Sequence, residues 1–116
     1  MYDEDKYIGV SVSPDQQYIV AATKDEAKRF DITGRLIDRW RVPGEFQDME
    51  SCAATGRSGL TNRIGQLYTN DRRDMHPDGW RVPEARFGKN KGVSSVSFDK
   101  ACNLYHGVWN GYRILK

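Results

Sequence analysis

The chain has 116 residues and a mass of 13.3 kDa, which is enough for one modest hydrophobic core but not for two independent ones. Eighteen Lys and Arg are interleaved with sixteen Asp and Glu, giving a formal charge of +2, so charge alone gives no case for nucleic-acid binding. No apolar run approaches the roughly 18 residues of a membrane-spanning helix, and the acidic start does not look like a signal peptide. We expect a soluble single domain without membrane insertion, in a compartment that the sequence does not define.

Residues 7–43 are predicted to form four short antiparallel strands. Alternating Val and Ser in "VSVS" lead into a turn at Pro14-Asp15, and the strand-like segments "YIVAAT", "AKRFDI" and "LIDRWRV" follow. The intervening "KDE" and "TGR" have turn composition, and Gly34 suits a turn that requires positive φ. This pattern is typical of a meander of four strands.

Residues 45–88 are interpreted as a second, more degenerate unit. "MESCAAT" is predicted to be its first strand and "GQLYTND" its next, with "GRSGLTN" as an unusually long connection between them. A turn at Pro77-Asp78-Gly79 then leads into a fourth strand that begins at Trp80.

Residues 89–116 match the first three strands of the first unit. "SVSFD" at 95–99 corresponds to "SVSPD" at 11–15, "NLYHGVW" takes the place of "YIVAAT", and "YRILK" that of "KRFDI". Asn110-Gly111 is a strong hairpin signal, because both central positions of a type I′ turn favour positive φ. A fourth strand is lacking.

The tetrapeptide "WRVP" occurs at 40–43 and again at 80–83, forty residues apart. A four-stranded antiparallel unit repeated at this interval is typical of a β-propeller blade. We therefore expect an all-β fold of blade-like repeats that forms an incomplete ring of just under three blades. Closed propellers have about four to eight blades, so we expect the ring to be completed by self-association or by other subunits of an assembly.

The units resemble those of the tectonin and tachylectin families of small propeller lectins. In those families a Trp-containing outer strand precedes a Ser/Val-rich inner strand and then a strand like "NLY" before a tight hairpin. The resemblance implies carbohydrate recognition by a β-propeller.

Two loops combine aromatic rings with groups that can hydrogen-bond sugar hydroxyls, and we predict that both bind ligand. The predicted site residues are Trp109, Asn110, Tyr112, Tyr68, Asn70, Asp71 and Arg72. Trp40 and Trp80, which recur at equivalent positions, are interpreted mainly as packing between blades. The alternative for the loops is that Asn-Asp and Asn-Gly only form turns.

Catalytic and metal-binding signatures are weak. His76 and His106 each lack a second His at ligand spacing, and "GRSGLTNR" lacks the Gly-Lys-Ser/Thr ending of a phosphate loop. Cys52 and Cys102 are far apart and are predicted to be buried reduced thiols. We expect no enzyme activity, no cofactor and no metal.

Two functions remain open, ahead of an enzyme. One is a lectin-like binding module, and the other is a structural or assembly protein, for example a component of a viral or phage particle. Fold alone does not choose between them.

Overall fold

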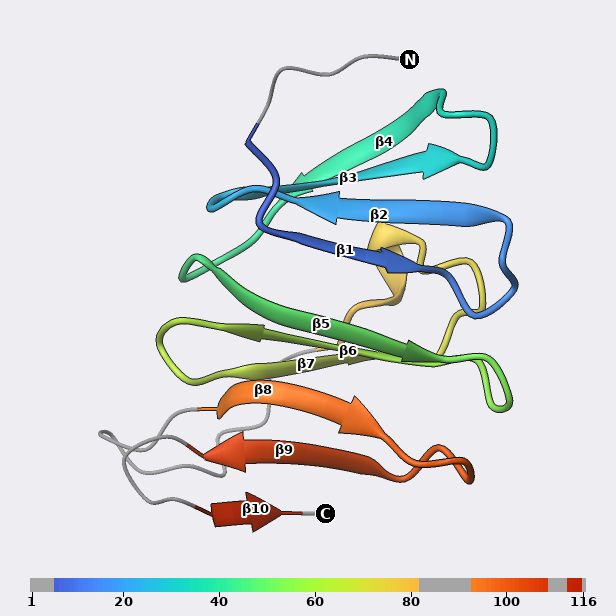
Figure 1. Cartoon of the computed structure of the whole chain (residues 1–116). Helices are drawn as coiled ribbons and strands as arrows, with labels where there is room; N and C mark the ends of the chain where they lie inside the picture. The colour runs from blue at the N-terminus through green and yellow to red at the C-terminus, as the bar shows by residue number, and fades with distance from the viewer. Residues whose placement is uncertain (1–5, 82–92, 109–112, 116) are drawn as a thin grey trace.

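The computed structural model describes residues 6–81, 93–108 and 113–115. In these residues the chain is all-β, with ten strands in three antiparallel sheets and a single short 3-10 helix. Figure 1 shows the sheets one above another, in chain order. Each sheet is open, and the described part of the chain forms no closed ring.

Sheet 1 contains four strands in chain order: β1 (Gly9–Val12), β2 (Tyr18–Ala22), β3 (Glu26–Asp31) and β4 (Leu36–Arg41). All three neighbouring pairs are antiparallel. The meander predicted for this part of the sequence is confirmed, and Gly34 in the β3–β4 turn has a φ of 95°.

Sheet 2 contains β5 (Phe46–Cys52), β6 (Arg57–Asn62) and β7 (Leu67–Asn70), again in chain order. The short 3-10 helix η1 (Pro77–Gly79) follows, and Trp80 then pairs with the end of β7 through one isolated antiparallel bridge. Among the described residues, the predicted fourth strand of this unit is therefore reduced to a single bridge.

The segment "GRSGLTN" is not a long connection, as the sequence had indicated, but forms the central strand β6. Its polar side chains are buried rather than solvated: Ser58, Thr61 and Asn62 are all fully buried. Asn62 donates through Nδ2 to the Pro43 carbonyl at 2.9 Å. Small polar residues favour loops in a single sequence, but here they are buried in the sheet. The Asn62 amide is satisfied there, whereas the Ser58 hydroxyl has no hydrogen-bond partner among the described residues.

Because β6 is a strand, the segment that was predicted to be the second strand of this unit is its third. The "LYTN" segment is β7, the third strand of sheet 2, whereas the similar "NLYHGV" supplies the second strand of sheet 3. The shared Leu-Tyr therefore does not mark equivalent strands.

Sheet 3 contains β8 (Val93–Phe98), β9 (Leu104–Val108) and β10 (Arg113–Leu115), with β9 in the middle. These strands agree with the three that were predicted for the end of the sequence.

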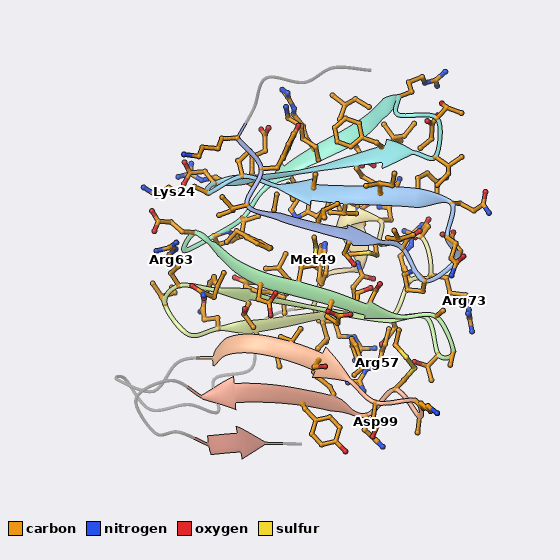
Figure 2. All side chains as sticks on the ribbon, viewed as in Figure 1. Lys24, Met49, Arg57, Arg63, Arg73 and Asp99 are labelled. Carbon is orange, nitrogen blue, oxygen red and sulfur yellow. A yellow bond between two sulfur atoms is a disulfide. The ribbon has the colours of Figure 1, made fainter. Side chains whose placement is uncertain are left out.

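The repeated "SVSPD" and "SVSFD" segments have the same local structure because each ends in a turn-forming Asp. The carboxylate of Asp15 accepts a hydrogen bond from the Gln17 backbone N–H at 3.0 Å. Asp99, at the β8–β9 turn in Figure 2, accepts from the backbone N–H groups of Ala101 and Asn103, each at 2.9 Å. An Asp that satisfies backbone donors two to four residues ahead is a common way to close a turn.

The main core lies between sheets 1 and 2. Val20 and Ala22 of sheet 1 pack against Phe46 and Met49 of sheet 2, all of them buried, and Figure 2 shows Met49 in this layer. A side chain at Gly9 would overlap the Phe46 ring. Glycine on β1 therefore permits the close approach of the two sheets.

Polar contacts join the three strands that run side by side, β1, β5 and β8 (Figure 1). Ser51 on β5 donates to the Val12 carbonyl of β1 at 2.6 Å. Asp48, also on β5, accepts from the Val96 backbone N–H of β8 at 2.9 Å. These bonds connect each sheet to the next at edges that would otherwise leave backbone groups unpaired.

Cys52 and Cys102 form a disulfide, which corrects the prediction of reduced thiols. Cys52 ends β5 and Cys102 lies in the turn before β9, and the packing of sheet 2 on sheet 3 brings their Cα atoms to 5.8 Å. That distance lies within the range for a disulfide. A separation of 50 residues in sequence gave no sign of this proximity.

Candidate functional site: an aromatic cleft between two sheets

A cleft of about 340 Å³ opens between sheets 1 and 2. Three aromatic side chains line it: Trp40, Tyr68 and Trp80. Leu60 also contributes to the lining, as do Arg41 and Arg81. Concave sites with an apolar lining and a few polar groups are the usual form of small-ligand sites.

The two tryptophans reach the cleft from corresponding places in their sheets. Trp40 lies on β4 and pairs with Ala27 of β3, whereas Trp80 pairs with Asn70 at the end of β7. Each Trp therefore follows the third strand of its own sheet. The centroids of the two rings are 6.4 Å apart and the ring planes are tilted by 38°, which is within the range of favourable aromatic pairs.

Both tryptophans have a packing role, as the repeat had suggested. Trp40 and Trp80 are partly buried and pack against the main core. They also line the open cleft. Their positions therefore combine structural packing with exposure of part of each ring to a ligand.

Tyr68 supplies the third ring from β7, opposite Leu60 of β6. Its ring packs on the core, and its hydroxyl lies 3.5 Å from Gln66 Oε1. Burial raises the pKa of Tyr68 above its usual value of 10, so the phenol is neutral at physiological pH. The side chain offers an apolar face with a polar end.

The indole nitrogen of Trp80 is a buried donor without a hydrogen-bond partner among the described residues. Such orphaned donors are uncommon in folded proteins, because an unmade hydrogen bond costs free energy. The nitrogen itself is shielded from solvent, so it is not a donor exposed to the cleft.

Arg41 and Arg81 also line the cleft. Arg81 is exposed and forms an ion pair with Asp71, whose other carboxylate oxygen lies 3.8 Å from Arg57. Arg41 is exposed, and its side chain has no ion pair or hydrogen bond with another described residue. The cleft therefore has positive charge beside its aromatic rings.

The predicted site residues of sheet 2 lie in different environments. Asn70 is fully buried: Nδ2 donates to the His76 carbonyl at 3.0 Å and Oδ1 accepts from the Arg72 backbone N–H at 2.9 Å. Its amide therefore holds the loop that follows β7 and does not face solvent. Arg72 is exposed and pairs with Asp74 at 3.1 Å, and Asp71 pairs with Arg81. Of the four residues predicted here, Tyr68 alone lines the cleft among the described lining residues.

Trp109, Asn110 and Tyr112 lie outside the described residues. Their segment connects the second and third strands of sheet 3, whereas the loop after Tyr68 and Asn70 connects the third strand of sheet 2 to the Trp80 bridge. The two loops therefore occupy different positions in their sheets.

The tryptophans of the repeated "WRVP" were expected to pack between blades and were not among the predicted site residues. The signal that could have identified them was present, because each Trp is followed directly by an Arg. That pairing places an aromatic ring and a cation at the same edge of two neighbouring sheets.

Neither a metal cluster nor a membrane-spanning helix is found in the described ranges. No group of three or more His, Cys, Asp or Glu gathers there in a way that could hold a metal ion. None of the helical structure in those ranges is long and apolar enough to cross a membrane.

No family model matches this chain, and no curated protein matches it. Its fold is similar to that of a solved protein of unknown function from Bacteroides caccae, with a TM-score of 0.55 and 11% sequence identity. The whole of this chain aligns with 46% of that chain, so it spans a little under half of that protein's length. At this identity the similarity concerns the fold alone.

Proposed function

We propose that this protein is a non-enzymatic binding module that recognises carbohydrate in the aromatic cleft. The observation that carries the proposal is the convergence of Trp40, Tyr68 and Trp80 on one open cleft. A pyranose ring has an apolar C–H face that stacks on an aromatic side chain, while its hydroxyls need hydrogen-bond partners. The Tyr68 hydroxyl is a group of this kind.

The three sheets support a lectin-like β-propeller that is completed by a second copy of the chain. Consecutive antiparallel meanders stacked through their first strands, β1, β5 and β8, have the arrangement of successive blades (Figure 1). The Bacteroides caccae protein contains this fold within a chain about twice as long. Two copies would supply a comparable amount of sheet.

The face of sheet 1 that points away from sheet 2 supports such completion. Gly9 and Ser11 of β1 meet sheet 2, so the alternating residues Val10 and Val12 occupy the opposite face. These two valines are 67% and 46% exposed, and Leu36 at the same side of the sheet is 40% exposed. A row of exposed apolar side chains on one sheet face marks an interaction surface.

Each single cleft is expected to bind weakly, because a sugar face covers little apolar area and its hydroxyls are well solvated in water. A closed ring with several clefts would bind a multivalent glycan surface more tightly, since the second contact forms at high effective concentration.

The assembly function is the second candidate, and the same exposed face of sheet 1 favours it. In that case neighbouring subunits cover the face and the cleft has no sugar ligand. A binding experiment separates the two functions.

The test is a glycan array probed with the unmutated protein and with variants of Tyr68. We expect the unmutated protein and Tyr68→Phe to bind the same glycans, because both keep the ring, and the variant to bind them more weakly, because it lacks the hydroxyl. Tyr68→Ala is expected to lose binding, while Ile64→Ala, which alters an exposed residue outside the cleft, is expected to retain it. An array without any signal from the unmutated protein would refute carbohydrate binding and favour the assembly function.

A further inference from the structure

We infer that the cleft selects sugars that carry a carboxylate over their neutral counterparts. This inference rests on the proposed function and adds the class of sugar to it. It follows from the charged side chains around the cleft. Stacking of a sugar on aromatic rings does not itself require charged groups.

The described lining residues of the cleft include two cations and no anion. Arg41 and Arg81 contribute to the lining, and no Asp or Glu does. A site for neutral sugars commonly uses carboxylates to accept hydrogen bonds from hydroxyls, because a carboxylate is a strong acceptor. This lining instead offers donors.

The two arginines differ in how far their charge is already compensated. Arg81 is paired with Asp71, which also lies near Arg57. Arg41 has no such partner in the described part of the chain, although Glu26 lies opposite it on β3. The Glu26 carboxylate is instead 3.7 Å from the Arg39 guanidinium. Arg41 is therefore the cation available to a ligand.

Arginine suits this role because of its shape. Its planar guanidinium can donate two parallel hydrogen bonds to one carboxylate. Uronic and sialic acids combine a pyranose ring with a carboxylate on that ring, so one ligand could stack on an aromatic side chain and pair with the Arg beside it. The sequence repeats this adjacency in Trp40-Arg41 and Trp80-Arg81.

The test compares acidic sugars with neutral counterparts that have the same rings. Trigalacturonate and its methyl ester form one pair, and sialyllactose and its methyl ester form the second. We expect the acid of at least one pair to bind roughly fivefold or more tightly at low salt, the range for one partly exposed charge-assisted pair. Raising NaCl from 50 to 500 mM is expected to reduce this preference.

Variants assign the preference to the cleft. Arg41→Gln is expected to abolish the preference for the acid while leaving the weaker binding of the neutral sugar, and Arg41→Lys to retain part of it. Arg63→Gln, at an exposed residue outside the described lining, serves as the control and is expected to keep the preference.

Failure of this inference is distinguishable from failure of the proposed function. Equal affinities within both pairs, or a preference that survives both Arg41→Gln and Arg81→Gln, would overturn it while glycan binding on the array stands. A protein that binds neutral glycans but neither acid also overturns it. Binding of no glycan of any kind overturns both.

Discussion

Removal of the disulfide between Cys52 and Cys102 is expected to destabilise the protein strongly. The bond joins the end of β5 to the turn before β9, across 50 residues of sequence. In the chain-entropy description, closing a loop of that length lowers the entropy of the unfolded chain by about 14 cal/mol/K, or about 4 kcal/mol at 25 °C. Domains of this size have a total stability of roughly 5–15 kcal/mol, so the loss is a large fraction of the whole.

The assay is urea unfolding of the Cys52→Ser/Cys102→Ser variant beside the unmutated protein, each followed by intrinsic fluorescence. We expect the midpoint to fall by about 2 M or more, given a slope near 1–2 kcal/mol/M. Unmutated protein in dithiothreitol should show the same fall, and thiol labelling of the unfolded, unreduced protein should find no free Cys. A free-energy change below about 1 kcal/mol, or two titratable thiols in the untreated protein, would refute the reasoning.

Three further predictions concern a buried arginine, two turn-forming carboxylates and self-association. Arg29→Ala is expected to lower the free energy of unfolding by about 3–5 kcal/mol in urea titrations, because the Arg29 side chain is only 5% exposed and pairs with two carboxylates. Its loss leaves Asp38 without its cation and Asp74 with Arg72 alone. A change under 1 kcal/mol would contradict this. Hydrogen bonds from Thr33 lower the pKa of Asp31 below the ordinary 3.8, and hydrogen bonds from Asn103 do the same for Asp99. The stabilisation from these carboxylates is therefore present above about that pH and is lost as the pH falls through the lowered pKa values of the folded protein. Asp99→Asn should flatten the acid limb of a plot of unfolding midpoint against pH, and an unchanged limb would count against the role of Asp99 in the turn. Val10→Glu should reduce self-association in sedimentation velocity, whereas Ile64→Glu, at an equally exposed residue, should not. If the unmutated protein is a monomer at micromolar concentration, completion of the propeller by a second copy of the chain is excluded.

The strands of sheets 1 and 3 could be predicted from the sequence because local signals agreed there. Alternating Val and Ser, an Asp that caps a turn, and Gly34 at positive φ all favour the same meander. Such agreement does not depend on contacts that are distant in sequence.

Sheet 2 was predicted less well because its central strand depends on tertiary contacts. Ser58 and Gly59 have low strand propensity, yet Gly59 lies where an added Cβ would meet Leu104 and Val96 of sheet 3 at 3.5 and 3.6 Å. These are ordinary contact distances, so sheet 3 packs closely against this strand, and that packing is invisible in local composition.

The candidate site could be predicted only in part for the same reason. Tyr68 was identified from its neighbours in the sequence, but the cleft also requires Trp40, which comes from another sheet. Asn70 was expected to contact ligand because its side chain is polar, and the structure uses that polarity to hold a buried loop. The disulfide was missed because the approach of Cys52 to Cys102 results from the packing of whole sheets.

The most direct test of carbohydrate binding in the cleft is a titration of ¹⁵N-labelled protein with the best glycan from the array, followed through the indole N–H signals. The chain has three tryptophans, and Trp→Phe variants assign the signals. We predict saturable shifts of the Trp40 and Trp80 signals with one common dissociation constant, and the loss of both shifts in Tyr68→Ala. Glycan binding that leaves the signals of Trp40 and Trp80 unchanged would contradict the account and place the site elsewhere.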